Sequence, residues 1–334
     1  MRTIVTLSAN DRKDLFRNTA HNMRLNDAII EKDFWVCYTL DYLFHRSPWK
    51  ENFTFKGGTS LSKAYNLIER FSEDIDLILD WRLLGYEIDE PWKLRSKNQQ
   101  DKFNKEANKR TVEFLLKDFC PKINEDFASE INADIEINSV ESNRDIIITF
   151  SYPAIFSNEY ILNQIKLEIG ALAAWSPSEK IEIKPYASEC YPTVFSCPAT
   201  SVLTVKPERT FWEKITILHQ EANRPQDKLM NPRYFRHYYD IHRMFSTTVK
   251  DNAFSQLDLL NRVVEFKQKF YPLSWAKYEE AVPGTLKLIP PDYRLSELKK
   301  DYLSMKDMFY GEKPDFNQVM NSIKLLETEI NNLK

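Results

Sequence analysis

The stretch FTFKGGTSLSK occupies residues 53–63, and RFSEDIDLIL follows it at residues 70–79. Its first four residues are rich in β-forming side chains and run directly into two glycines, which indicates a strand that ends in a turn. Apolar residues then recur at helical spacing as far as Arg70, and a second strand is predicted over residues 75–80. The apolar stripe of the helix consists of Leu61, Ala64, Tyr65 and Ile68. The sequence therefore predicts a strand, a glycine turn, a helix and a returning strand.

The glycine turn is the first candidate binding site. Only 6 of the 334 residues are glycine, so the adjacent pair Gly57 and Gly58 needs a physical reason. Glycines let a phosphate chain approach backbone N–H groups closely, and the N-terminus of the following helix favours anionic oxygens. Thr59 and Ser60 add hydroxyl donors, although the same residue types also serve as ordinary helix caps. The turn is therefore a candidate phosphate-binding site.

Two acids stand at the beginning of the second strand. The carboxylates of Asp74 and Asp76 project from the same face, because strand side chains alternate. On its own, such a pair also fits the solvated edge of a sheet, and the pattern is common. The direct return of the chain from the glycine turn to these two acids is what favours a functional pair.

A third acid, Glu168, lies in a strand-like run in which Ile165, Leu167 and Ile169 point the other way. Lys166 shares the face of Glu168. Three carboxylates around Mg²⁺ suit an in-line displacement in which metal ions activate an attacking hydroxyl and neutralise a triphosphate. The alternative interpretation of Lys166 and Glu168 is the polar face of a half-exposed strand.

Other segments show their own periodicity. Helical spacing over residues 11–44 predicts two helices before the first strand, and residues 91–121, with eight basic and four acidic side chains, predict a basic helix. Strand-like alternation is present over residues 131–137, 145–152 and 164–169. The proline-containing residues 176–207 favour loops and short strands. Helices are predicted from there to the end, including residues 208–220 and 315–334.

These elements predict an α+β protein. A small mixed β-sheet core is expected to be flanked by helices and followed by a C-terminal helical lobe. Residues 1–200 are expected to form the α/β domain, and residues 201–334 a helical domain that contributes to the active-site cleft. A chain of this length commonly divides into two domains.

Composition excludes several classes of protein. There are 46 Lys+Arg against 49 Asp+Glu, a formal net charge of −3, which excludes a polybasic protein. Hydrophobic residues make up 43% and charged residues 28%, as in ordinary globular chains. The four cysteines are scattered without a CxxC pair, which argues against a disulfide framework or a structural zinc site. With no apolar leader and no long apolar run, we expect a cytoplasmic protein without a membrane partner.

The first block, FKGGTSLSK (residues 55–63) followed by RFSEDID (residues 70–76), resembles the nucleotidyltransferase toxins of the AbiEii/AbiGii group. This group belongs to the DNA polymerase β-like nucleotidyltransferase superfamily. Four further blocks are similar to the family in the same order, and an ordered set is more specific than any single block. They are EKDFW at residues 31–35, KLE at 166–168, ERTFWEK at 208–214 and RHYYD at 236–240.

The resemblance assigns roles residue by residue. Asp74 and Asp76 would be metal ligands, Glu168 the third acid, and Asp240 the acidic catalytic residue of the last motif. Residues assigned to the nucleotide are Gly57, Gly58, Thr59, Ser60, Lys63, Lys166 and Lys214. Without the resemblance, the residues allow purely structural interpretations. Lys214 would be a solvated helix position paired with an acid, and Asp240 would pair with Arg236 one turn away.

The resemblance further implies a Mg²⁺-dependent enzyme, with Mn²⁺ as an alternative ion, that transfers a nucleotidyl group from an NTP and releases pyrophosphate. It implies the toxin of a toxin–antitoxin or phage abortive-infection system, with a cognate antitoxin. The implied acceptor is RNA, above all the 3′ end of tRNA, so that translation stops. Candidate RNA contacts are Lys102, Lys105, Lys109 and Arg236, although a charged run is usually a solvated helix face.

Two other functions stay open from the residues alone. The same chemistry would serve an enzyme that modifies an antibiotic or a protein, for which no basic surface is needed. A protein that binds an NTP or a partner without catalysis would keep the glycine turn but transfer nothing.

Overall fold

The structure is a computed structural model, and it describes residues 1–72, 74–131, 137–142, 145–158 and 161–333. The chain divides into two compact units. The first unit comprises Met1–Ala64 and Ser72–Val205, and the second comprises Tyr65–Phe71 and Lys206–Lys334.

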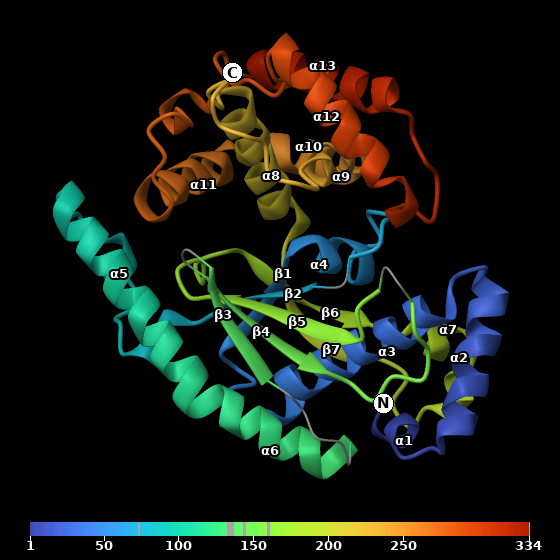
Figure 1. The fold of residues 1–334 in the computed structure, drawn as a ribbon. Helices are drawn as coiled ribbons and strands as arrows, with labels where there is room; N and C mark the ends of the chain where they lie inside the picture. The colour runs from blue at the N-terminus through green and yellow to red at the C-terminus, as the bar shows by residue number, and fades with distance from the viewer. Residues whose placement is uncertain (73, 132–136, 143–144, 159–160, 334) are drawn as a thin grey trace. The chain divides into compact units, whose positions relative to one another are not determined.

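A mixed β-sheet forms the centre of the first unit (Figure 1). Within the described residues it has seven strands in the order β3-β4-β5-β2-β1-β7-β6. The strands are β1 (Phe53–Lys56), β2 (Asp74–Leu79), β3 (Ile137–Ser142), β4 (Asp145–Ser151), β5 (Gln164–Gly170), β6 (Ser178–Ile183) and β7 (Thr200–Val205). Strand β2 runs parallel to β5, and β1 runs parallel to β7, whereas the other neighbours are antiparallel. The α+β class predicted from the sequence is confirmed.

Helices surround this sheet, and several begin where the sequence places a capping side chain. Ser8, Asn26 and Ser96 each accept a backbone N–H at the beginning of α2, α3 and α5. The α-helices of the first unit are α1 (Arg2–Val5), α2 (Ala9–Met23), α3 (Asp27–Asp41), α4 (Gly57–Lys63), α5 (Lys97–Phe114), α6 (Cys120–Ile131) and α7 (Tyr186–Cys190). Shorter helical turns are η1 (Tyr42–Arg46), η2 (Trp81–Leu84), η3 (Glu90–Trp92), η4 (Leu115–Phe119) and η5 (Pro192–Val194).

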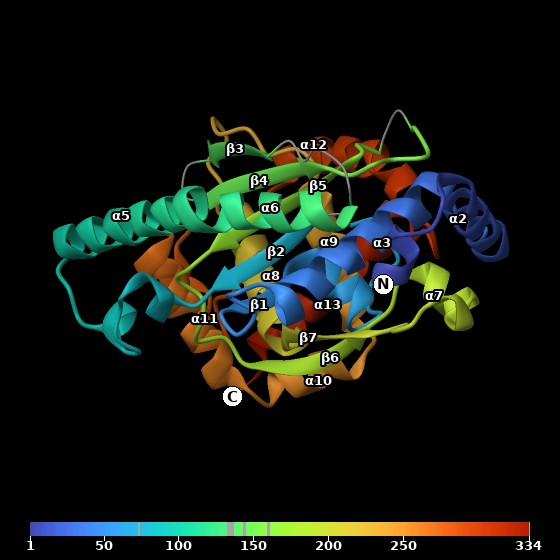
Figure 2. The ribbon, with the colours of Figure 1, turned by 90° about the horizontal axis from the view of Figure 1, so that it is seen from below.

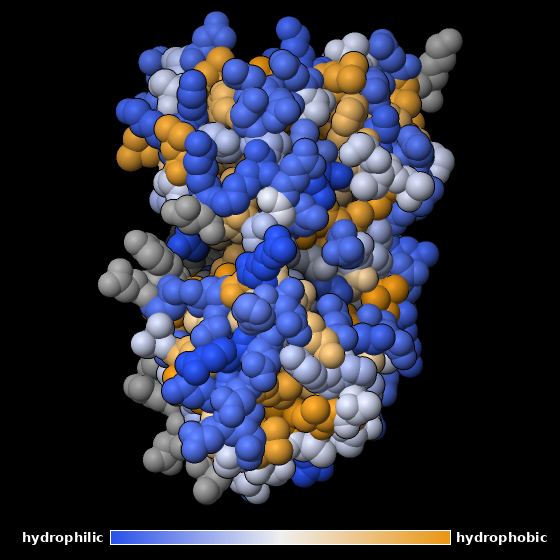
Figure 3. Space-filling model, turned by 90° about the vertical axis from the view of Figure 1, so that its right-hand side faces the viewer, coloured by the Kyte–Doolittle hydropathy of each residue, from blue (hydrophilic) through white to orange (hydrophobic). Residues whose placement is uncertain are grey.

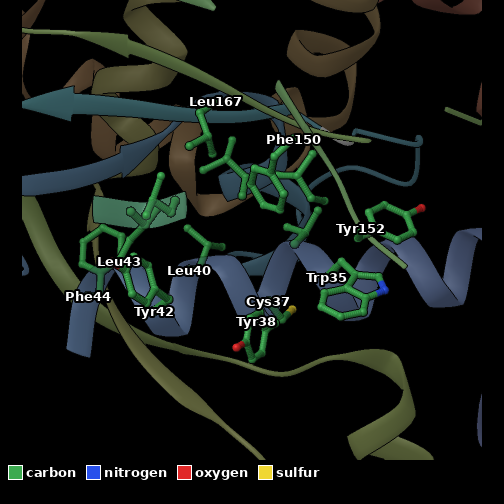
Figure 4. Close-up of a cluster of buried hydrophobic side chains, with 14 of the residues drawn as sticks. Trp35, Cys37, Tyr38, Leu40, Tyr42, Leu43, Phe44, Phe150, Tyr152 and Leu167 are labelled. Atoms are coloured by element: carbon green, nitrogen blue, oxygen red, sulfur yellow. The ribbon is translucent and has the colours of Figure 1, made fainter. Parts of the chain in front are cut away.

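One face of the sheet is covered by α3 and α6 (Figures 1 and 2). Figure 4 shows Leu40 of α3 on the side of the helix that faces Phe150 and Leu167 of the sheet. Trp35 of α3 stacks on Tyr152, with ring centroids 5.5 Å apart. Because this face takes the apolar side chains of the strands, the polar side chains that alternate with them lie on the opposite face.

The second unit is helical. Its α-helices are α8 (Pro207–Ala222), α9 (Phe235–Phe245), α10 (Thr248–Phe254), α11 (Leu257–Phe270), α12 (Asp292–Ser304) and α13 (Phe316–Asn331), with the turns η6 (Tyr278–Glu280) and η7 (Lys306–Met308). Helix α8 is buried over most of its length and packs against α9, α10 and α11. Helix α13 begins with a capping box between Asp315 and Gln318.

The helix after the glycine turn is shorter than predicted. It ends at Lys63 instead of near Arg70, and Asn66 adopts a left-handed conformation with φ 51°. Residues 65–71 belong to the second unit, where Arg70 forms an antiparallel bridge with Phe309 and the Phe71 N–H donates to Met308 O at 2.7 Å. Ile68 is therefore buried without being helical.

Two other differences concern strands. The predicted strand over residues 131–137 spans the end of α6 at Ile131 and the beginning of β3 at Ile137, and residues 132–136 lie outside the described residues. The proline-containing segment contains β7, which lies inside the sheet between β1 and β6. The first unit consequently extends to Val205, whereas the sequence placed the boundary at residue 200.

The surface drawn in Figure 3 is mostly hydrophilic, with small separate hydrophobic areas. All four cysteines are free thiols, and Cys37 and Cys120 are buried. Among the described helices, none combines the length and apolar character needed to cross a membrane.

Candidate active site

Four predicted site residues lie on adjacent parallel strands at matching levels. In the register of β2 and β5, Asp74 lies opposite Lys166 and Asp76 opposite Glu168. All four are half-buried, and the strand residues between them are buried among the core side chains. The four side chains therefore share the face of the sheet opposite α3, with neighbouring strands about 4.8 Å apart. The alternation predicted for this stretch of β5 is confirmed.

Lys166 bridges two acids of this face, Asp74 and Glu168. Its ammonium lies 3.4 Å from Oδ2 of Asp74 and also contacts Oε1 of Glu168. Partial burial disfavours the ammonium, but the contact with Glu168 and the charge of Asp74 outweigh it and raise the pKa of Lys166. Within the described part of the chain, no three metal-ligating side chains converge. The carboxylate oxygens are hard ligands of the kind that Mg²⁺ takes, and the backbone register places them on one face of two neighbouring strands.

Gly57 lies directly against the carboxylate of Asp76. Lys56, the last residue of β1, pairs with Asp76 across the ladder, and the chain then turns at Gly57 with φ +83°. A Cβ atom at Gly57 would stand 2.6 Å from Cγ of Asp76. Glycine is therefore required both by the left-handed conformation and by the space that the carboxylate fills. The turn and the acid pair form one site in the first unit.

The hydroxyl groups of the turn bind the backbone. Thr59 Oγ1 donates to the carbonyl of Asp74 at 2.6 Å, and Ser60 Oγ donates to the carbonyl of Gly57 at 2.8 Å. Both side chains are buried. Thr59 thus ties the beginning of α4 to the beginning of β2, which fixes the turn relative to the acids. The backbone N–H groups at the beginning of α4, Gly58 among them, are the donors that a helix leaves for an anion.

Lys63 points away from the turn into the protein. Its ammonium is 2.6 Å from Oδ1 of Asp33 and 3.8 Å from the ring centroid of Tyr186. Burial opposes the charge, but the Asp33 carboxylate outweighs it and raises the pKa of Lys63. The other oxygen of Asp33 accepts the Tyr186 N–H at 2.7 Å. The ion pair connects α3 to the end of α4, so in the structure Lys63 positions the turn.

A second group of site residues surrounds Asp240 in the second unit. Asp240 is fully buried on α9, and both its oxygens bind Arg70, at 2.7 and 2.8 Å. Lys214 of α8 reaches Oδ2 of Asp240 at 2.8 Å. Burial alone would raise the pKa of Asp240, but the charges of Arg70 and Lys214 outweigh it and lower the pKa below the usual range. Arg236 donates instead to the Arg233 carbonyl, so it is not the partner of Asp240.

Three of the residues predicted to contact RNA are exposed, and the fourth, Arg236, is half-buried. Lys102, Lys105 and Lys109 are exposed on α5, and their spacing of three and four places them along one face of that helix. Lys105 forms an exposed ion pair with Asp101 at 2.7 Å. These positions leave three cationic side chains accessible to a large ligand.

The comparisons with known proteins identify the family. The family model described as "Nucleotidyl transferase AbiEii toxin, Type IV TA system" matches residues 41–322. The chain belongs to this family. Among solved structures, MenT4, a nucleotidyltransferase toxin from Mycobacterium tuberculosis H37Rv, is similar at 14% identity, covering 93% of this chain and 98% of that one, with a TM-score of 0.44. Among curated proteins, none matches the sequence significantly.

Membership of the AbiEii family makes the chain a nucleotidyltransferase toxin of a type IV toxin–antitoxin system, as the sequence blocks indicated. It implies an NTP substrate and a cognate antitoxin. The family match includes the glycine turn, the acids of β2 and β5, and the Lys214–Asp240 pair. The individual roles of these residues remain predictions.

Sequence reasoning did not find the partners of three residues that organise these sites. Lys56 pairs with Asp76 across the ladder, and Glu168 pairs with Asp76 from the other side, so one row crosses β1, β2 and β5. In β1, Lys56 follows two phenylalanines that alternate with polar residues and are buried. This alternation is the signal in the sequence that places Lys56 on the polar face of the sheet. Asp33 and Arg70 gave no local signal of their partners, because those partners lie 30 and 170 residues away along the chain.

Gly57→Ala is expected to destabilise the protein and to displace Asp76. Alanine at φ +83° costs about 1–2 kcal/mol, and the clash with the Asp76 carboxylate adds to this cost. Gly85→Ala is the matched control, because Gly85 has φ +80° in the same unit and its Cβ would meet its nearest neighbour at 3.8 Å. Chemical denaturation and nucleotide-transfer rates would be measured for both variants. Equal behaviour of the two would show that the space beside Asp76 is not needed.

Proposed function

We propose that this AbiEii-family enzyme transfers a nucleoside monophosphate from an NTP to RNA, with the 3′ end of tRNA as the acceptor. The observation that supports the proposal is the row of carboxylates on β2 and β5, which lies directly beside the glycine turn. An acceptor with a free 3′ hydroxyl and a polyanionic backbone suits a toxin that stops translation. Blocking that hydroxyl would prevent aminoacylation.

In this proposal Asp74 and Asp76 hold a divalent ion, Mg²⁺ or Mn²⁺, with Glu168 as the third ligand. When bound, such an ion activates the attacking hydroxyl and neutralises the triphosphate. The RNA hydroxyl oxygen forms a bond to the α-phosphorus, and the bond from that phosphorus to the oxygen bridging to the β-phosphate breaks. Pyrophosphate leaves, and Glu168 accepts the hydroxyl proton.

Lys166 has two positions in the proposed reaction. In the structure its ammonium is held between Asp74 and Glu168. Because the triphosphate is a more concentrated anion than either carboxylate, we propose that Lys166 moves to a phosphate oxygen and thereby frees both acids. Gly57 and Gly58 would offer backbone N–H groups, with Thr59, Ser60 and Lys63 fixing the turn rather than donating to phosphate.

The helical unit would contribute Lys214 and Asp240. Lys214 carries the positive charge that the family assigns to the incoming triphosphate, and Asp240 fixes its ammonium at 2.8 Å. Arg70 binds the same carboxylate, so Lys214 is not required to neutralise Asp240 alone. Lys214 can consequently turn toward an added phosphate without leaving a buried unpaired acid.

The decisive experiment offers the purified protein total cellular RNA and each α-³²P-labelled NTP in turn. We expect label in a tRNA-sized band with Mg²⁺ or Mn²⁺ and none after EDTA, because without the ion the three carboxylates repel the triphosphate. Replacing Lys102, Lys105 and Lys109 by Gln is expected to lower the affinity for RNA and to make that affinity less dependent on salt, while the affinity for NTP is unchanged. Label in protein or in a small molecule instead of RNA would overturn the acceptor, and no label in any fraction would overturn the reaction.

A further inference from the structure

Asp33 lies on α3, in the sequence block at residues 31–35 that takes no part in the proposed reaction. Its side chain and that of its partner Lys63 are each 7% exposed, and their charged atoms are 2.6 Å apart. Tyr186 contacts both members of the pair. Its ring centroid is 3.8 Å from the ammonium, and its N–H donates to the second oxygen of Asp33 at 2.7 Å. Both oxygens of the carboxylate are therefore bound, and its position is fixed.

A buried ion pair is a poor source of stability. Taking two charges out of water opposes folding, and apolar side chains of similar volume in the same place often stabilise a protein as well or better. An ion pair of this kind is satisfied in one geometry, whereas apolar contacts tolerate several. The contribution of Asp33 and Lys63 is therefore expected in the position that they give to α4.

Helix α4 connects this ion pair to the acids of β2. Lys63 is its last residue and Gly57 its first, about 9 Å away along the helix axis. A Cβ atom at Gly57 would stand 2.6 Å from Cγ of Asp76, and Thr59 donates to the carbonyl of Asp74 at 2.6 Å. All these residues belong to the first unit. A shift of α4 at Lys63 would consequently move the glycine turn against both acids.

We propose that Asp33 is a positioning residue for nucleotide transfer, which holds Lys63 and thereby keeps the glycine turn in place against Asp74 and Asp76. The inference rests on the proposed function, because these two acids are its metal ligands. Asp33 acts through α4 and does not touch the substrate. A displacement of the reacting groups by about 1 Å is enough to lower the rate about 10²-fold.

The double variant Asp33→Asn/Lys63→Met separates position from stability. Asp33→Asn alone leaves a buried ammonium without its carboxylate and should lower the melting temperature by about 10 °C. Adding Lys63→Met removes that charge, so most of the loss should be recovered, while the amide oxygen at position 33 still accepts the Tyr186 N–H.

The double variant nevertheless lacks the directional contact that fixes α4. Hydrogen exchange over residues 57–64 should therefore stay about tenfold faster than in the unmodified protein. At saturating Mg²⁺ and NTP, kcat should stay about 100-fold lower, with the KM for NTP within about threefold of the unmodified value.

Glu31→Gln is the matched control. Glu31 is a second buried acid of α3, but its carboxylate accepts the N–H groups of Ile155 and Phe156 and does not contact α4 in any printed hydrogen bond or ion pair. Its variant should lower the melting temperature and leave both kcat and the exchange over residues 57–64 unchanged. Equal effects of Glu31→Gln and Asp33→Asn on kcat would mean that general destabilisation explains the loss.

Three results for the double variant would overturn the inference. They are recovery of kcat together with the melting temperature, unchanged exchange over residues 57–64, and a raised KM for NTP with an unchanged kcat. The last result would assign Lys63 to the nucleotide itself. An unmodified protein that transfers no nucleotide, combined with faster exchange over residues 57–64 in the double variant, would refute the proposed function alone.

Discussion

Asp76→Asn is expected to reduce the rate of nucleotide transfer by at least about 10³-fold while the fold is kept. Asp76 lies at the centre of the proposed site, between Lys56 and Glu168 in the sheet and against Gly57 in the turn. Asparagine has nearly the same shape, so it fills the same space beside the glycine. It lacks the negative charge with which Asp76 would hold the proposed divalent ion.

The measurement is single-turnover transfer of labelled nucleotide at saturating Mg²⁺, with Asp14→Asn as the control. Asp14 is an exposed acid on α2, and its variant should transfer nucleotide at the unmodified rate. Thermal melting would verify that Asp76→Asn is folded. A folded variant whose rate stays within tenfold of the unmodified rate would exclude Asp76 as a metal ligand. Asp74 and Glu168 would then be the acids to test.

The parts of the site that sequence reasoning found are local. The strand, the glycine turn and the returning acids lie within residues 53–79, where alternation and turn chemistry act over a few residues. The placement of Glu168 beside Asp76 was accessible because Ile165, Leu167 and Ile169 reveal which face of β5 is buried. The pairing of β7 with β1 was not accessible, because β1 lies far from β7 along the chain.

The parts that sequence reasoning missed depend on distant contacts. The apolar stripe after Lys63 looks helical, yet residues 65–71 leave the first unit to bond with residues 308–310. The sequence around Arg70 does not reveal its partner Asp240 on α9. The sequence around Lys63 likewise does not reveal its partner Asp33. A basic residue has many possible acidic partners in the sequence, so only the folded structure determines which acid it pairs with. These contacts nevertheless decide which side chains are free to meet a ligand.

Asp240→Asn is expected to destabilise the second unit by about 3–5 kcal/mol, because it leaves the buried Arg70 and Lys214 without their carboxylate. The neutral amide accepts at one oxygen only, whereas the carboxylate accepts from both cations. Asp227→Asn is the matched control, since Asp227 is exposed in the loop after α8. It should change stability by less than about 0.5 kcal/mol.

The pH dependence separates this structural role from a role in chemistry. Arg70 and Lys214 lower the pKa of Asp240 in the folded protein. Its contribution to stability is therefore present above the unfolded value, about 3.9, and is lost as the pH falls through the folded pKa. Asp240→Asn should remove that contribution at neutral pH and leave a flatter dependence below pH 4.

Hydrogen exchange resolved by peptide would locate the effect. We expect faster exchange in α8, α9 and residues 65–71 of Asp240→Asn, with the sheet of the first unit unchanged, because the ion pairs lie within the second unit. Unchanged exchange together with lost nucleotide transfer would mean that Asp240 acts on the substrate and that its ion pairs contribute little to folding. Faster exchange accompanied by lost transfer would mean instead that the carboxylate holds Lys214 in place, so that stability and transfer fail for one electrostatic reason.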